Sequence, residues 1–403
     1  MNLWKKVLIG LIIGVSLGPI LAKFPKWLDI ASVIGSMFLR SLKMMMGPLI
    51  FCTLVKGILN SSNAKSLGRI GFKIVTISVV TTTFAVIFGL GVGILLQPGK
   101  NPGFEPALST ASVVLDKFSF KNLIIGIIPE NVIEAFSKGN LLQIVFFSIF
   151  AGVVMNQFKS KSNNLQKVVS FFSTLVFEMI AIIVSCSPYG VCALMASTIA
   201  VQGITVLLSV SKFVAAMIVA MTLQYLIYGL LICIYCRKSP LPFYRKSLEY
   251  QLLAFSTSST KAALPTTIEI AVNKLGISKT SASVMLPISA AVNMNGSAIG
   301  LGISAIFSAQ LYSIQLDITD YLAIIVSSTL GAIGGAGVPG TSIITLPVVL
   351  QSANIPIESV PILASIDRLL DMLRTTVNVT GDVAMTLVVD HSENNWDINK
   401  YKS

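Results

Sequence analysis

The sequence predicts an all-α, polytopic membrane protein, and two observations support this prediction. Of the 403 residues, 54% are hydrophobic and only 11% are charged, and the mean hydropathy is +0.82. A soluble domain has roughly a quarter of charged residues, so this chain lacks the charge for a water-facing surface of its size. The second observation is a series of apolar segments of roughly 20 residues, the length at which a helix crosses a bilayer.

The first half of the chain contains most of these segments. We expect spans at residues 7–22, 30–59, 70–97, 141–157, 166–197 and 207–236. The first follows two lysines and resembles a signal peptide, but no A-x-A cleavage site accompanies it, so a first span is favoured. The segments 30–59 and 166–197 exceed the length of an upright span, which predicts tilt or extension into water.

Basic residues predict the orientation of the spans. If the spans alternate, five basic clusters fall on one side of the membrane: Lys5 and Lys6; Lys56, Lys65 and Arg69; Lys159, Lys161 and Lys167; Arg237, Lys238, Arg245 and Lys246; Lys400 and Lys402. Such clusters mark the cytoplasmic side, so both termini are expected in the cytoplasm. The net charge of +12 is spread over these clusters rather than gathered in one patch, which argues against nucleic-acid binding.

The last 160 residues follow a different pattern, because their apolar segments are interrupted. The breaks are STSST at 256–260, NMNGS at 293–297 and GAIGGAGVPG at 331–340. Irregular backbone at membrane depth is tolerated where it is buried in protein or lines a cavity. Hairpin-like interrupted segments, each followed by a helix, are typical of a transporter with inverted repeats.

A polar stripe follows these breaks. Asp367, Asp371, Arg374, Asn378 and Asp382 are spaced by 4, 3, 4 and 4 residues, which places them on one face of a helix. Three aspartates and an arginine at the bilayer centre would cost on the order of 10 kcal/mol unless they face water, one another or an ion. An amphipathic helix with a solvated face and internal ion pairs is one interpretation. The favoured one is a path for substrate and ion.

The residue types in the stripe indicate what it would bind. Carboxylate and amide oxygens suit a hard cation such as Na⁺. An arginine fork suits a carboxylate, and an aspartate can accept hydrogen bonds from an ammonium group. Together they indicate an acidic amino acid.

Enzymatic function is not expected. The only histidine, His391, lies in the polar C-terminal tail, and no nucleophile–base pair emerges. Cys233 and Cys236 form a lone CIYC pair, and the glycine-rich GAIGGAGVPG lacks the lysine of a phosphate loop. We therefore expect no cofactor beyond a coupling ion, Na⁺ or H⁺.

At these residues the sequence resembles the dicarboxylate/amino acid:cation symporters, which include glutamate/aspartate transporters. The resemblance covers nearly the whole chain through FLRSLKMMMGPLIF, STSSTKAALP, NMNGS, GAGVPG and DMLRTTVNVTGD. It implies eight transmembrane helices plus two re-entrant helical hairpins, an elevator-type mechanism and a homotrimer in the lipid membrane.

The resemblance also implies a division of the chain. Residues 1–69 would form scaffold helices 1 and 2, 70–97 helix 3 of the transport domain, and 98–206 scaffold helices 4 and 5 with their connecting loop. Residues 207–390 would complete the transport domain with helices 6 to 8 and both hairpins, and 391–403 would be a cytoplasmic tail.

Site residues follow from the same resemblance. Asp371 would bind the substrate amino group and Arg374 its side-chain carboxylate, with Thr375 and Asn378 near the main-chain carboxylate. The remaining substrate contacts would be Thr260 and Val338 at the hairpin tips, and Ser297. The cation site would comprise Thr81, Asn293, Asn295, Asn378 and Asp382.

Several positions depart from the family pattern. Asn295 stands where the family has an aspartate, Ser78 replaces a tyrosine, and Ala291 and Gly335 replace hydroxyl residues, so fewer Na⁺ ions, or H⁺, are expected. Leu301 replaces the acidic residue linked to K⁺, so K⁺ coupling is not expected. Ser258 occupies a hairpin position where some relatives carry an arginine, and Lys261 or Arg368 could supply that charge.

The combined prediction is a secondary active symporter in the inner membrane of a prokaryote. It would import glutamate or aspartate coupled to Na⁺, H⁺ or both. The alternatives are a C4-dicarboxylate or neutral amino-acid symporter of the same family, and an uncoupled amino-acid-binding channel.

Overall fold

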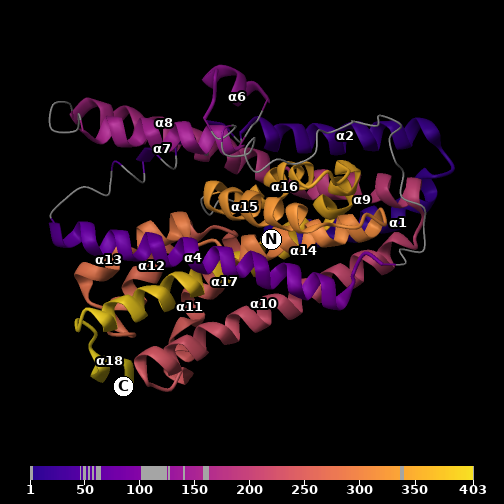
Figure 1. Ribbon diagram of the computed structural model, residues 1–403. Helices are drawn as coiled ribbons and strands as arrows, with labels where there is room; N and C mark the ends of the chain where they lie inside the picture. Colours follow the sequence, from indigo (N-terminus) through magenta and orange to yellow (C-terminus); the bar gives the residue numbers. More distant parts are fainter. Residues whose placement is uncertain are drawn as a thin grey trace.

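The described part of the chain is built from helices, as Figure 1 shows. The computed structural model describes residues 3–45, 47–48, 51–52, 55–56, 59, 65–100, 125, 128–138, 141–157, 163–335 and 340–402. Over these residues it contains helices, turns and bends but no strand. The predicted all-α class is therefore confirmed for them.

Four of the expected spans correspond to helices at nearly the expected positions. They are α1 (Leu3–Leu21), α4 (Lys65–Leu96), α7 (Leu141–Gln157), which follows the short α6 (Val132–Lys138), and α10 (Val206–Cys236). Helix α2 (Pro25–Met44) covers the first half of the expected 30–59 span, and much of the second half lies outside the described residues.

The expected long span at 166–197 is divided into two helices, and its tilt or extension into water stays a prediction. Two helices, α8 (Asn163–Ser185) and α9 (Ser187–Gln202), meet there at an angle of 51°. Pro188 lies in the first turn of α9, where its missing N–H costs nothing but its ring prevents the preceding helix from continuing. The excess length is therefore accommodated by a bend.

Three helical stretches among the described residues are long and apolar enough to cross a membrane. They are Lys73–Leu96, Val206–Cys236 and Lys279–Leu311, and the bent α8–α9 pair would make a fourth. The third stretch combines α13 (Lys279–Val292) and α14 (Asn295–Leu311), which the NMNGS segment separates. The total of eight spans stays a prediction.

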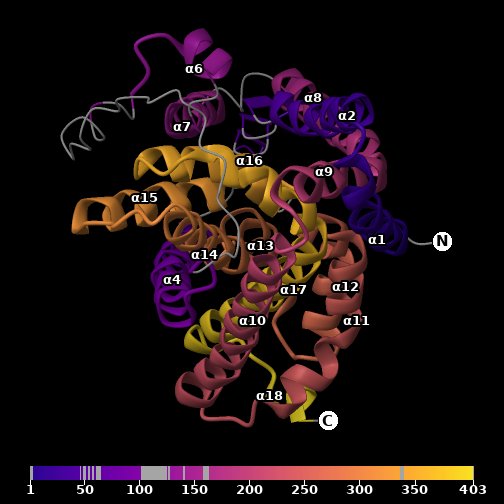
Figure 2. The same cartoon turned by 90° about the vertical axis from the view of Figure 1, so that its right-hand side faces the viewer.

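Two helix pairs occupy the places of the expected hairpins. Helices α11 (Leu241–Thr257) and α12 (Thr260–Asn273) pack on each other, as do α15 (Ile318–Gly335) and α16 (Thr341–Ser352), which lie side by side in Figures 1 and 2. The first pair turns at Ser258, which has a left-handed φ of 51°, and Ser259, whose hydroxyl accepts a hydrogen bond from the Ala262 N–H. Residues 336–339 of the second tip, including Val338, lie outside the described residues.

Helix α17 (Val360–Ser392), which follows the short 3-10 helix η2 (Ile357–Ser359), is the central element. It contacts α9, α10, α11, α13 and α14, and less extensively α1, α4, α12 and α16. Because α17 is surrounded by protein, its polar face is buried. Figure 2 shows α17 between α10 and the α11–α12 pair.

The remaining helices pack in two groups. Helices α1 and α2 pack on α9, and α2 also contacts α8 at one edge of the molecule. Helix α4 packs on α13 and α14 instead. The division into scaffold and transport domains concerns relative motion and stays a prediction.

The C-terminal tail is docked onto the ends of several helices. The Trp396 Nε1–H donates to the Leu275 carbonyl at 2.8 Å, and the Asp397 N–H to the Gly276 carbonyl at 2.8 Å. The Lys246 Nζ donates to three backbone carbonyls, those of Lys274 at the end of α12 (3.0 Å) and of Lys400 (2.8 Å) and Tyr401 (3.0 Å) in α18 (Ile398–Lys402). The polar tail thus joins α11, α12 and α17 at one end of the molecule.

Candidate substrate and ion site

All five members of the polar stripe on α17 are buried. Their exposed fractions are 7% for Asp367, 4% for Asp371, 3% for Arg374, 2% for Asn378 and 2% for Asp382. A solvated face, one of the two interpretations of this spacing, is therefore wrong. Burying these groups is costly unless each is paired or hydrogen-bonded, so their partners define the chemistry of the site.

Charged residues at the N-terminal end of the stripe compensate one another. The Arg374 Nη2 donates to Asp367 Oδ1 at 2.5 Å and to Asp371 Oδ1 at 3.3 Å. Arg368 lies three residues before Asp371, and its Nη1 is 3.8 Å from Asp371 Oδ2. Two arginines and two aspartates therefore form a neutral group of four charges, which we call the charge quartet.

The second helix pair reaches the charge quartet through its backbone. The Gly340 N–H donates to Asp371 Oδ2 at 3.0 Å. Gly340 has a left-handed φ of 78°, which glycine adopts without strain, and α16 begins at the next residue. Thr375 lies one turn after Asp371 and donates its hydroxyl to the Asp371 carbonyl at 2.7 Å.

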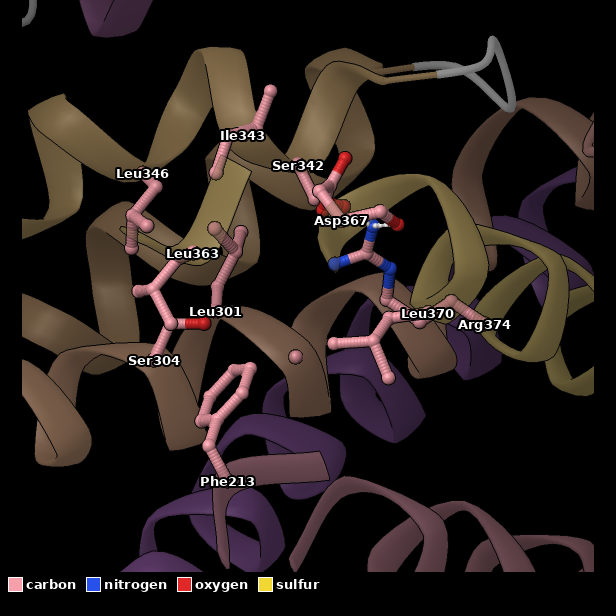
Figure 3. A pocket seen from close by; sticks show the side chains of 11 residues that line it. Phe213, Leu301, Ser304, Ser342, Ile343, Leu346, Leu363, Asp367, Leu370 and Arg374 are labelled. Carbon is pink, nitrogen blue, oxygen red and sulfur yellow. Dashed lines mark hydrogen bonds and ion pairs between the residues drawn. The ribbon is translucent and has the colours of Figure 1, made fainter. Parts of the chain in front are cut away.

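A pocket opens beside the quartet, and Figure 3 shows that Arg374 and Asp367 point toward each other at its edge. Ser304 and Ser342 add hydroxyl groups, and the apolar lining comes from Phe213, Gly300, Leu301, Ile343, Leu346, Leu363 and Leu370. Within the described part of the chain, neither the Arg374 Nε nor the Ser342 Oγ has a hydrogen-bond partner. The pocket is therefore lined by residues with polar atoms that no described residue uses.

Asn378 connects the stripe to the NMNGS break. Its Oδ1 accepts from the Gly296 N–H at 2.7 Å, and its Nδ2 donates to Ser297 Oγ at 3.3 Å. The amide thereby satisfies a free N–H at the start of α14. Gly296 lies so close to α17 that a Cβ there would approach the Arg374 carbonyl oxygen to 2.5 Å.

A second polar cluster surrounds Asp382. Its Oδ1 accepts from Ser289 Oγ at 2.8 Å and Asn293 Nδ2 at 3.0 Å, and Thr81 Oγ1 on α4 donates to Asn293 Oδ1 at 3.3 Å. The Asp382 Oδ2 is buried without a hydrogen-bond partner among the described residues. A carboxylate, an amide oxygen and hydroxyls are ligands that Na⁺ accepts, so this donor set fits a hard cation or a proton.

Asn295 lies in a separate chain of neutral hydrogen bonds. Its Oδ1 accepts from Thr82 Oγ1 at 3.1 Å, and its Nδ2 donates to the Tyr228 hydroxyl at 3.0 Å. Asn295 is fully buried. This chain joins α4, α14 and α10 with no charge in it, so Asn295 has two protein partners where a cation ligand was predicted.

Two residues of these clusters were not predicted from the sequence. Ser289 precedes Asn293 by one helical turn, so its spacing could have suggested it. Tyr228 lies in the middle of the apolar α10, and the sequence offers no local sign of its partner.

The first helix pair contacts the neighbourhood of the site through Thr260. Its hydroxyl donates to the Ala290 carbonyl on α13 at 3.2 Å, three residues before Asn293. Of the predicted site residues, Thr81, Asn293 and Asp382 therefore share one cluster, and Asp371 and Arg374 share another. Asn378 and Ser297 lie between them along α17 and α14.

A family comparison decides the class of this protein. The family model described as "Sodium:dicarboxylate symporter family" matches residues 3–392. The chain belongs to this family. It is therefore a transporter rather than an enzyme, and its apolar helices make it a multi-pass membrane protein.

The names of individual relatives of this symporter give different substrates. The chain is 29% identical to a proton/sodium-glutamate symport protein of Bacillus subtilis, covering 97% of this chain and 93% of the relative. It is 30% identical to a proton/glutamate-aspartate symporter of Escherichia coli, over 98% and 94%. It is also 32% identical to a C4-dicarboxylate transport protein of Laribacter hongkongensis, over 99% and 91%.

Proposed function

We propose that this symporter imports glutamate or aspartate across the inner membrane of a bacterium, driven by H⁺, Na⁺ or both. The observation that supports the proposal is the burial of Asp371 and Arg374 on adjacent turns of α17, within one group of opposite charges. A carboxylate for the ammonium group and a guanidinium for the side-chain carboxylate are what an acidic amino acid requires.

The charges of the site give a physical reason for coupling. The charge quartet is neutral by itself. An acidic amino acid near neutral pH has a net charge of about −1, so its entry leaves a buried negative charge. A co-transported cation removes that charge, and without one the cost of desolvation opposes uptake.

The coupling ion would bind at Asp382. Its unpartnered Oδ2, with Ser289, Asn293 and Thr81 nearby, could take a proton or join a Na⁺ shell. Because Asn295 is neutral and hydrogen-bonded at both ends, we expect fewer Na⁺ ions than a carboxylate there would bind. Asn378 would border both substrate and ion.

The remaining roles complete the proposal. Thr375 and Asn378 would contact the main-chain carboxylate, Ser297 would support Asn378, and the tips at Thr260 and Val338 would cover the substrate. The protein would work as a homotrimer of elevator-type units in the lipid membrane, with both termini in the cytoplasm.

A C4-dicarboxylate symporter is the second candidate, because one of the similar relatives is named as such. Asp371 separates the two candidates. A dicarboxylate lacks the ammonium group that Asp371 would bind, and it would leave two more negative charges beside Asp367 and Asp371. Succinate or malate uptake without glutamate uptake would support this candidate.

Reconstitution into liposomes tests the proposal. Accumulation of labelled glutamate or aspartate is measured while Na⁺, H⁺ and voltage gradients are imposed one at a time. We expect accumulation under an inward Na⁺ or H⁺ gradient, and none without a gradient. Binding of glutamate without accumulation under any gradient would instead favour an uncoupled channel or binding protein.

A further inference from the structure

The nitrogen atom Nη2 of Arg374 is already fully used by the protein. It donates to Asp367 Oδ1 at 2.5 Å and to Asp371 Oδ1 at 3.3 Å, and the Asp367 carbonyl oxygen lies at 3.5 Å. An Nη2 amino group has two hydrogens. Both hydrogens therefore have carboxylate acceptors on the same helix.

The shape of a guanidinium makes this occupancy important. A carboxylate can bind in a bidentate manner along two edges, Nε with Nη2 or Nη1 with Nη2. Both edges include Nη2. While Asp367 and Asp371 accept from Nη2, an incoming carboxylate can form only single hydrogen bonds with the guanidinium of Arg374.

A second feature of Arg374 is a donor atom that no described residue uses. Arg374 and Ser342 line the same pocket, and the Arg374 Nε and the Ser342 Oγ are buried without a hydrogen-bond partner within the described residues. Figure 3 shows the Asp367 carboxylate beside the Arg374 guanidinium. The substrate's carboxylate and the Asp367 carboxylate would thus compete for one nitrogen atom.

We propose that Asp367 is a specificity-determining residue. Its carboxylate holds Arg374 in place of the substrate's side-chain carboxylate, and it thereby limits the affinity for acidic substrates. This inference rests on the proposed function, because it assumes that Arg374 binds that carboxylate. Only a substrate whose carboxylate can displace Asp367 gains the bidentate contact. Neutral amino acids leave the pair of Arg374 and Asp367 in place.

Arg368 supplies a second cationic partner for Asp371 during such an exchange. Its Nε and Nη1 are buried and form no hydrogen bond within the described part of the chain, although Nη1 lies 3.8 Å from Asp371 Oδ2. When Arg374 turns to the substrate, Asp371 can strengthen its contact with Arg368. Asp371 then keeps a cation beside it.

The test compares Asp367→Asn with wild type in proteoliposomes. We expect the KM for glutamate or aspartate to fall about tenfold, because removing a competing charge-assisted hydrogen bond frees one edge of Arg374. The inhibition constants of the amides glutamine and asparagine should stay unchanged, and kcat should not rise. Asp29→Asn, the same change at an exposed position on α2, is the matched control.

The outcomes separate the two proposals. A wild-type protein that accumulates no acidic amino acid overturns the proposed function. If wild type accumulates it but the KM of Asp367→Asn is unchanged or higher, Asp367 merely orients Arg374 and the inference is overturned. Asp367→Ser, which also removes the carboxylate, repeats the measurement if the first variant is not recovered in folded form.

Discussion

Arg374 is the residue on which recognition of acidic substrates depends in the proposed function. We expect Arg374→Ala to lower kcat/KM for glutamate about 100-fold, since truncating one partner of a buried charge pair costs about 2–5 kcal/mol. Competition by neutral amino acids should fall much less. Initial uptake rates with labelled glutamate, with and without competing glutamine, measure both effects.

An exposed arginine provides the control for this change. Arg237→Ala, at the end of α10, should leave both rates near wild type. An equal loss of acidic and neutral substrates in Arg374→Ala would show that the residue supports the fold rather than substrate choice. Melting temperatures of both variants monitor that possibility.

Asp382 is the residue that should determine the response to the coupling ion. Asp382→Asn removes the only carboxylate of its cluster, so we expect at least a tenfold loss of Na⁺ or H⁺ dependence of uptake at fixed substrate. Ser289→Ala, which removes one hydrogen bond to Asp382, should have a smaller effect in the same direction. Uptake measured against Na⁺ concentration at fixed pH, and against pH without Na⁺, distinguishes the ions.

A neighbouring hydroxyl serves as the reference for that titration. Thr386 lies one turn after Asp382, and its buried Oγ1 has no hydrogen-bond partner among the described residues. Thr386→Val should therefore keep the wild-type cation response. An unchanged titration in Asp382→Asn would remove Asp382 from the ion site.

The sequence predicted the composition of the stripe but not its pairing. Spacing along one helix is a local property, so the shared face of Asp367 to Asp382 could be read directly. The hydrogen bond between Asn295 and Tyr228 joins residues 67 positions apart, and no local pattern encodes it. No local pattern encodes the hydrogen bond from the Gly340 N–H to Asp371 either, because it depends on how the second helix pair folds back.

At the scale of elements, the close approach of α14 to α17 positions the site. A Cβ on Gly296 would meet the Arg374 carbonyl oxygen at 2.5 Å, and backbone cannot move aside as a side chain can. We expect Gly296→Ala to lower the stability by about 1–3 kcal/mol or more, as overpacking does. Thermal unfolding of the purified protein would measure this loss.

Gly91 on α4 is the matched control, because no heavy atom lies within 4 Å of a Cβ built there. Gly91→Ala should be neutral or stabilising by up to about 1 kcal/mol, since alanine favours the helix. If both substitutions had the same effect, close packing would not explain the glycine at 296.

Element boundaries were predicted well where apolar runs end in charged or glycine-rich segments, as at 141–157 and 207–236. The bend within 166–197 was not predicted, because hydropathy measures length and not direction. Pro188 was visible in the sequence, but proline in a long apolar run is compatible with a kinked span or with two helices. In the structure the chain bends there and α9 packs on α1 and α2.

At the scale of the whole molecule, the docked C-terminal tail joins helices that are distant in sequence. Lys246→Met would leave three backbone carbonyls without their shared donor, so we expect a fall of several degrees in melting temperature. Lys238→Met, in the connection between α10 and α11, tests whether the loss of any nearby lysine has this effect. Equal melting temperatures for wild type and Lys246→Met would show that the tail adds little stability.

The self-neutralising charge quartet also has a consequence for the history of the family. A change that removes one charge from it leaves the opposite charge stranded in the interior, whereas losing Asp367 and Arg374 together keeps the interior neutral. Lineages that drift from acidic toward neutral substrates should therefore exchange these positions in pairs. The site that we propose for substrate selectivity would thus also restrict the order in which that selectivity can evolve.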